Sequence, residues 1–264
     1  MPAEARRLLI IDLLGRSGGV SVTGLARELG VSEMTIRRDL DWLEGHAVLK
    51  RVHGGAINSQ KEEEQPFENR ALRSNPQKTL IGWTAAQMVR AGERIILDAG
   101  TTTQQVARNL AGCGGLTVIT NNINIMAVLA GMPQIEAIML GGSLKHIEMC
   151  TVGPMVTQAL SMLAVDKCFL SVAGFDAGQG LTDQDMREVE VKQAMMHSAR
   201  EVILVADSTK WGQVKLARVA PLSGVHKVVS DDQLPPEAVA AFETAGVEVI
   251  TPERLGASEK ARGA

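Results

Sequence analysis

Residues 21–56, SVTGLARELGVSEMTIRRDLDWLEGHAVLKRVHGGA, constrain the fold more than any other part of the chain. The pattern predicts two short helices joined by a tight turn. Ser21 is the predicted N-cap of the first helix, Gly30 supplies the turn, and Ser32 caps a second helix that runs to about Glu44. This order of signals is typical of a helix-turn-helix motif.

The second predicted helix has two chemically different faces. Ile36, Leu40 and Leu43 lie at i, i+4 and i+7 and therefore share one buried stripe. A helix that packs on one side and offers hydroxyl and guanidinium groups on the other is suited to the DNA major groove. The side chains on the opposite face are Met34, Arg38 and Asp41, flanked by Thr35 and Arg37.

A short basic hairpin follows this helix. Val48–Val52 form a predicted strand that carries Lys50 and Arg51, after which His53 and two glycines turn the chain back. With MPAEARRLLIIDLL as the first helix, residues 1–57 form a predicted winged helix-turn-helix domain that binds double-stranded DNA. The predicted base-reading residues are Met34, Thr35 and Arg38, the predicted phosphate contacts are Arg37, Lys50 and Arg51, and the DNA-binding set also includes Ser32 and His53.

The alternative for this segment is a small helical bundle with a solvated charged face. That interpretation suffices for Arg37 and Arg38 taken alone. The two caps, the glycine turn, the apolar stripe and the basic wing occur in order within residues 21–56, and this combination favours the DNA-binding domain.

Composition limits the classes of partner. The net charge of the 264 residues is −3, which excludes a generally cationic binder that ignores sequence. Residues 1–56 hold 8 basic and 7 acidic side chains, so the attraction for DNA must come from a local patch. The three cysteines form no CxxC pair, and neither a metal site nor a cofactor is predicted. With no predicted membrane span or signal peptide, we expect a cytoplasmic protein.

The composition turns polar after the winged domain, at NSQKEEEQ (58–65), where three consecutive glutamates indicate a solvated connector. Residues 58–75 are the predicted linker, including a connecting helix over 66–73. Residues 76–253 are the predicted second domain, and 254–264 are a C-terminal tail.

Strand-like apolar runs alternate with helical stretches through the second domain. Continuous apolar strands separated by helices predict a Rossmann-like, mainly parallel α/β sheet that is covered on both faces. The predicted strands are 96–99, 117–120, 136–140, 167–174, 201–207, 226–231 and 247–251, and the predicted helices are 76–89, 103–110, 123–129, 155–162, 189–199 and 236–245.

The first of these strands runs straight into a helix through DAGTTT (98–103). In sheets of this type, ligands bind beyond the carboxyl ends of the strands. Gly100 permits a tight turn, the backbone N–H groups of the helix start point outward, and Thr101, Thr102 and Thr103 add three hydroxyls, so a phosphate site is predicted here. An ordinary strand-to-helix turn with threonine caps fits these residues equally well.

Polar groups and glycines also follow the other strands. Lys192 or Lys210 could neutralise a phosphate, and Asp98 or Asp176 could accept hydrogen bonds from hydroxyl groups. Glu188 lies four residues before Lys192 on one helix face, where the two can pair. Together these side chains predict a site for a small phosphorylated sugar or polyol. The further members are Asn121 after the second strand, Gly141 and Gly142 after the third, and Gly174 with Asp176 at the end of the fourth.

Both halves of the chain resemble the DeoR family of bacterial transcriptional regulators. The N-terminal likeness rests on VSEMTIRRDL (31–40) and RVHGGA (51–56), and the C-terminal likeness on DAGTTT (98–103), VITN (118–121), LGG (140–142) and VADSTK (205–210). The resemblance implies a sensor domain similar to ribose-5-phosphate isomerase and phosphorylated sugars or their breakdown products as effectors. It also implies that the protein represses a carbon-catabolic operon.

The predicted regulator is a homodimer or homotetramer, because one winged domain buries too little surface for useful operator affinity. The effector would favour one arrangement of the DNA-binding domains. A sugar-phosphate isomerase with an appended DNA-binding module is the main alternative. Its candidate catalytic residues would be Glu188 and either Lys192 or Lys210. Against it, the isomerase's paired acidic motif is replaced by AGFD (173–176), with one carboxylate. In a third interpretation the second domain only oligomerises.

Overall fold

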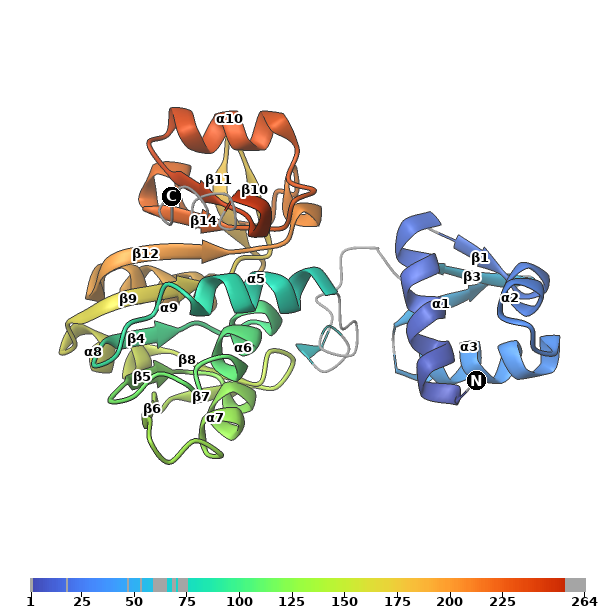
Figure 1. Ribbon diagram of the computed structural model, residues 1–264, viewed down its shortest axis with the longest axis horizontal. Coiled ribbons are helices and arrows are strands. Elements are labelled where there is room, and N and C mark those ends of the chain that lie inside the picture. The colour runs from blue at the N-terminus through green and yellow to red at the C-terminus, as the bar shows by residue number, and fades with distance from the viewer. Residues whose placement is uncertain are drawn as a thin grey trace, which may run out of the picture. The chain divides into compact units, whose positions relative to one another are not determined.

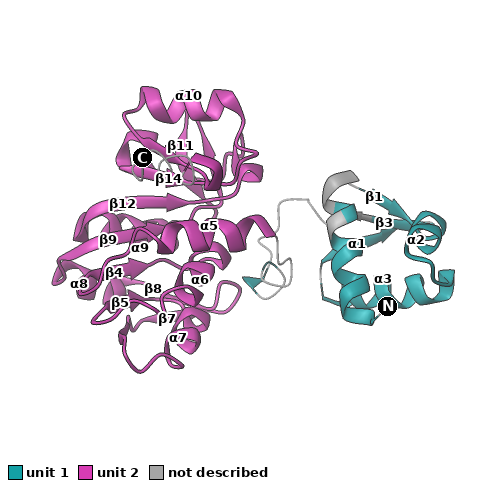
Figure 2. Cartoon of the chain, in the orientation of Figure 1, with its two compact units in different colours: residues 1–74 teal, residues 75–264 magenta. Residues whose placement is uncertain are grey.

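The computed structural model describes residues 2–17, 19–46, 48–52, 54–58, 66, 67, 70 and 76–254. The chain divides into two compact units, Met1–Ser74 and Asn75–Ala264 (Figure 2). Most of the predicted linker with its connecting helix lies outside the described residues, as do Ala47, His53 and most of the predicted tail. Among the described helices, none is long and apolar enough to cross a membrane.

The first unit is a winged helix-turn-helix. Ser21 and Ser32 cap their helices as predicted, since the Ser21 Oγ accepts from the Gly24 N–H at 3.0 Å and the Ser32 Oγ accepts from the Thr35 N–H at 3.2 Å. Gly30 adopts the left-handed conformation, with φ of 64°. The elements are helices α1 (Ala3–Ser17), α2 (Val22–Leu29) and α3 (Glu33–Gly45) and strands β1 (Gly19–Ser21), β2 (Leu49–Val52) and β3 (Gly55–Asn58).

The predicted apolar stripe of α3 forms the core of this unit. Ile36, Leu40 and Leu43 are fully buried, and Ile10 and Leu14 of α1 pack in the same cluster. The wing is a three-stranded antiparallel sheet in the order β1-β3-β2. β1 was not predicted, because a three-residue strand is too short to show an alternating pattern.

The second unit is built on a seven-stranded sheet whose strands are all parallel, in the order β15-β14-β12-β9-β4-β5-β6 (Figure 1). This confirms the predicted α/β fold. The strands are β4 (Arg94–Leu97), β5 (Thr117–Thr120), β6 (Glu136–Met139), β9 (Val165–Leu170), β12 (Ala199–Val205), β14 (Lys227–Val229) and β15 (Glu248–Ile250).

Helices cover both faces of this sheet. Successive strand residues point to opposite sides, and because both sides are apolar, both must be buried. Ile95 and Leu97 pack in one apolar cluster with α5 (Pro76–Ala86), α6 (Thr101–Arg108) and α7 (Ile123–Leu129). Ile96, between them, packs in a second cluster with α8 (Pro154–Ser161), α9 (Met186–Ser198) and α10 (Pro236–Thr244). The helix positions agree with the sequence prediction to within a few residues.

Two small sheets beside the main one were not predicted. One is the hairpin of β7 (Ser143–Lys145) and β8 (Cys150–Val152). The other has the order β10-β11-β13, formed by β10 (Gly174–Asp176), β11 (Gly180–Asp183) and β13 (Ala217–Ala220). Short 3-10 helices, η1 (Ser208–Lys210) and η2 (Leu222–Gly224), complete the unit.

The prediction that Gly174 and Asp176 close the fourth strand is wrong. β9 ends at Leu170, and residues 174–176 belong to the separate strand β10. The apolar run continues through the break, so composition does not reveal it. At Gly174 a Cβ atom would lie 2.2 Å from the backbone oxygen of Gln213, which shows that glycine serves close backbone packing at this position.

Candidate DNA-binding surface and candidate effector site

The outward face of α3 carries the predicted base-reading side chains. The Met34 side chain is 60% exposed, and Arg38 is exposed and has no ion pair with any residue that the structure describes. Thr35 is half-buried, and its hydroxyl lies 2.9 Å from that of Ser32 within the helix cap. A free guanidinium on the solvent face of a packed helix is the group that reads guanine in the major groove.

The other predicted DNA contacts beyond α3's base-reading residues and Ser32 differ in how exposed their side chains are and in whether they have partners. Lys50 is exposed on β2. Arg37 is exposed, with its Nη2 atom 3.4 Å from the Glu33 carboxylate. Arg51 pairs with Asp41 of α3 and donates to the Arg37 carbonyl at 3.3 Å, so it joins the wing to the helix, a contact that the sequence pattern did not predict. His53 lies outside the described residues.

Asp39 is a buried carboxylate on α3 that the sequence interpretation missed. Its side chain receives the Nε atoms of two α1 arginines, Arg6 at 2.5 Å and Arg7 at 3.0 Å. The Arg7 guanidinium also lies 4.1 Å from the centre of the Trp42 ring. We call Arg6, Arg7 and Asp39 the Asp39 clamp. It fixes the rotation of α3 against α1.

In the second unit, two of the predicted effector residues, Asp98 and Lys192, meet where the direction of the sheet changes. β4 and β9 are neighbours, but the chain continues from β4 toward one sheet edge and from β9 toward the other. Ligands of open α/β sheets bind at such switch points. Asp98 follows β4, and its Oδ2 atom accepts from the backbone N–H of Ser171, which follows β9, at 3.0 Å.

Lys192 of α9 completes this buried junction. Its Nζ atom donates to Asp98 Oδ2 at 2.6 Å and to the Ser171 carbonyl at 2.9 Å, and lies 3.4 Å from Asp183. Burial alone would lower the pKa of Lys192, but the negative charges of Asp98, Asp183 and Glu188 outweigh it and raise that pKa. Lys192 therefore favours its protonated form, and the carboxylates of Asp98 and Asp183 balance its charge within the protein.

The predicted pair between Glu188 and Lys192 is not formed, because each side chain has a different partner. Glu188 pairs with Lys145 of the β7–β8 hairpin, and Lys192 with Asp98. Burial raises the pKa of Glu188 from 4.5 to about 8. Lys145 was not predicted, since the hairpin that brings it to α9 leaves little trace in the sequence.

The start of α6 is the part of the predicted phosphate site that remains open to hydrogen bonding. Thr103 is committed internally, since its hydroxyl lies 2.7 Å from the Asp98 carbonyl oxygen and 2.8 Å from that of Gly100. The hydroxyls of Thr101 and Thr102 make no hydrogen bond to a described residue, although both side chains are buried. Gly100 has an extended φ of 177°, so it is required by close contact with Ser171 and not by a left-handed turn.

Asn121 follows β5, the strand next to β4, and contributes a buried oxygen that has no partner among the described residues. Its amide nitrogen donates to the Thr151 carbonyl at 2.9 Å, whereas its Oδ1 atom has no hydrogen-bond partner in the described part of the chain. Gly141 is exposed and leaves open space at its Cβ position. Gly142 packs tightly, since a Cβ there would lie 2.7 Å from Val156 Cγ2.

Two predicted effector residues have evident structural partners. The Asp176 carboxylate accepts the backbone N–H groups of Gly178 and Gln179, at 2.8 and 3.0 Å, in the turn after β10. Lys210 donates to the Val172 carbonyl at 2.5 Å. Asp176 therefore shapes a turn, while Lys210 remains half-buried near the end of β12.

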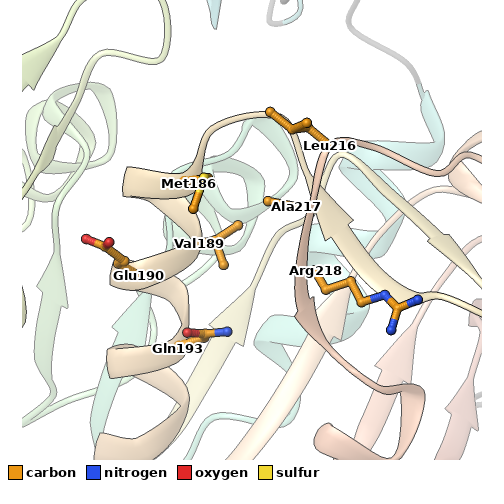
Figure 3. A pocket seen from close by; sticks show the side chains of 7 residues that line it. All are labelled: Met186, Val189, Glu190, Gln193, Leu216, Ala217 and Arg218. Carbon is orange, nitrogen blue, oxygen red and sulfur yellow. The ribbon is translucent and has the colours of Figure 1, made fainter.

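A surface pocket of about 420 Å³ lies on the opposite face of α9 (Figure 3). None of the predicted effector residues lines it. Its walls are the outer face of α9 and strand β13. The lining residues are Met186, Val189, Glu190, Gln193, Leu216, Ala217 and Arg218.

Comparisons with known proteins agree with both halves of this architecture. The family model of the DeoR-like helix-turn-helix domain matches residues 6–62, and that of the DeoR C terminal sensor domain matches residues 73–232. A solved D-ribose-5-phosphate isomerase aligns with 51% of this chain and 52% of its own, at 13% identity and a TM-score of 0.38. A likeness this weak carries no implication for function.

Two curated relatives align over nearly their whole length. The HTH-type transcriptional regulator YulB of Bacillus subtilis is 36% identical over 250 residues, which cover 94% of this chain and 96% of that protein. The glycerol-3-phosphate regulon repressor of Haemophilus influenzae is 32% identical over 242 residues, which cover 92% of this chain and 94% of that protein. The chain therefore belongs to the DeoR family of transcriptional regulators.

Proposed function

We propose that this regulator represses a sugar or carbon catabolic operon and that a phosphorylated sugar or polyol controls it. The glycerol-3-phosphate regulon repressor among its relatives supports the metabolite class. The single observation that carries the DNA-binding half is the exposed Arg38 opposite the buried Ile36 on α3.

In this proposal Met34, Thr35 and Arg38 read base edges, while Arg37 and Lys50 bind phosphates. Ser32 lies at the start of α3, where backbone N–H groups favour a phosphate. Arg51 keeps the wing against α3, and His53, which lies outside the described residues, stays a predicted phosphate contact. Two or more copies bind the operator together, because one winged domain buries limited surface.

The effector would bind at the start of α6. Thr101 and Thr102 supply hydroxyl and amide donors for the phosphate, and the free Oδ1 of Asn121 accepts from a sugar hydroxyl. The buried ion pair of Asp98 and Lys192 lies at the end of β4, and Glu188 and Lys210 are further predicted members of the site. Gly141 lets the ligand approach the backbone. The effector acts by its differential affinity for two arrangements of the DNA-binding domains.

Operator binding is tested by fluorescence anisotropy with DNA from upstream of the gene. Arg38→Ala should cost about 1–3 kcal/mol and relax base preference at one position, whereas Lys50→Ala should weaken all sequences alike. Arg108→Ala is the matched control, since Arg108 is exposed on α6 of the other unit. Equal operator affinity for wild type and Arg38→Ala would refute the assignment.

Effector binding is tested by thermal shift against a panel of phosphorylated sugars and polyols. A specific ligand should raise the melting temperature of the wild type, and the rise should be lost in Thr101→Val, which removes one hydroxyl with little change in volume. Thr157→Val on α8 is the control, since Thr157 lies outside the proposed site and its hydroxyl donates only to the Pro154 carbonyl of its own helix, at 3.2 Å. If the ligand still raises the melting temperature of both Thr101→Val and Thr102→Val, the effector binds elsewhere.

The isomerase alternative has no observation in its favour. Its candidate base, Glu188, is engaged by Lys145, and Lys192 is engaged by Asp98. We expect no turnover of ribose 5-phosphate by the purified protein. Turnover that disappears in Glu188→Gln would establish the enzyme instead.

A further inference from the structure

The pocket between α9 and β13 has an apolar centre and charges of opposite sign at its two sides. Val189 and Ala217 lie between the walls, while Glu190 extends from the helix side and Arg218 from the strand side, both pointing away from the centre (Figure 3). An apolar core surrounded by a charged rim is the usual layout of a protein–protein interface.

Large apolar side chains stand exposed at one end of this pocket. Leu216 is 82% exposed and Met186 is 66% exposed, and the two come from opposite walls. Val214, two residues before Leu216, is also exposed. Single exposed apolar residues are common, but a group of them at the edge of a pocket is typical of an interaction surface.

The distribution of charge indicates which protein that is. A two-fold axis that runs parallel to the groove between α9 and β13 sets one pocket against another and places the helix wall of each copy against the strand wall of its partner. Glu190 of each copy then meets Arg218 of the other, so the surface is complementary to itself. Within the part of the chain that the structure describes, Glu190 makes no ion pair, and the Arg218 guanidinium donates a hydrogen bond to the uncharged side chain of Gln179.

An added β-strand fits this surface less well. β13 pairs with β11 on one side. On the α9 side, the Gln193 side chain donates to the Val219 carbonyl at 3.0 Å, so the strand edge is already capped there. A partner must therefore bind this surface through side-chain contacts and not by adding a strand.

We infer that the surface formed by Met186, Glu190, Leu216 and Arg218 is the contact between two copies of this chain. This inference rests on the proposed function, in which two or more copies bind the operator together, and it assigns their contact to the outer face of α9. No DNA or metabolite is needed for this contact to form.

The test is sedimentation velocity of the full chain over a concentration series. Glu190→Arg and Arg218→Glu should each raise the dissociation constant on the order of tenfold, because each places like charges together twice in a two-fold contact. The double variant Glu190→Arg/Arg218→Glu restores both opposite-charge pairs and should return the dissociation constant toward that of the wild type. Glu237→Arg on α10 is the control for charge reversal alone and should change nothing.

Leu216→Ser is an independent probe of the apolar part and should also weaken the oligomer. A monomeric wild type, single variants that associate like the wild type, or a double variant as weak as the singles would each overturn the inference. The proposed function fails separately, through an absence of operator binding by the wild type. If the wild type binds operator as an oligomer and none of these variants changes its dissociation constant, only this interface is refuted.

Discussion

Lys192 donates to Asp98 at 2.6 Å across 94 residues of sequence, joining the outer helix α9 to the end of the central strand β4. Both side chains are almost fully buried. The pair also holds the Ser171 backbone at the end of β9, so one ion pair fixes the junction at which the direction of the sheet changes. This junction is the floor of the proposed effector site.

Lys192→Met should lower the free energy of unfolding by about 3–5 kcal/mol, because it leaves the Asp98 carboxylate buried without a cation. The double variant Asp98→Asn/Lys192→Met should lose less than the sum of the two single variants. Urea denaturation followed by circular dichroism measures both. Arg108→Met is the control at an exposed position, and a Lys192→Met variant as stable as this control would contradict the prediction.

The ionisation of Glu188 should make the stability of the second unit depend on pH. Its pKa is raised from 4.5 to about 8 by burial, so between these values the folded chain holds a proton that the unfolded chain has released. The free energy of unfolding should therefore fall as the pH rises through this window, relative to Glu188→Gln, which cannot titrate. Denaturation of both proteins at a series of pH values checks the sign. Parallel curves would show that Glu188 does not titrate there.

Removing the carboxylate of the Asp39 clamp should weaken operator binding without touching the DNA-reading face. Asp39→Asn leaves two α1 arginines facing a neutral amide, and we expect a loss of stability of the first unit on the order of 3 kcal/mol. Hydrogen exchange in α3 and operator affinity are the two measurements. Glu28→Gln, an exposed change in the same unit, is the control. Unchanged exchange in α3 would show that the clamp does not position the helix.

The adjacent glycines Gly141 and Gly142 should respond differently to alanine. A Cβ at Gly142 would lie 2.7 Å from Val156 Cγ2 and 2.8 Å from the Val152 carbonyl oxygen, whereas nothing lies within 4 Å of one at Gly141. Gly142→Ala should therefore cost about 1–3 kcal/mol of stability through overpacking, and Gly141→Ala close to nothing. Thermal unfolding compares them. Because only Gly141 faces open space, Gly141→Ala should reduce the effector-induced thermal shift if the ligand approaches there.

Local patterns were sufficient to predict much of the architecture. The Ser21 and Ser32 caps, the Gly30 turn and the Ile36 stripe each depend on groups within a few residues of one another, and all are confirmed. The seven main strands were found because a parallel sheet buried on both faces needs continuous apolar runs. The positions of Asp98 and Asn121 at strand ends followed from those strands.

The tertiary structure alone decided which charges meet. Lys145 binds Glu188, Lys192 binds Asp98 and Arg51 binds Asp41, although sequence spacing favoured Glu188 with Lys192 and a phosphate for Arg51. Helix periodicity fixes which residues share a face, but not which distant element packs on it. Burial then selects the partner, because a charge removed from water must be balanced by whatever group the fold brings within a few ångströms.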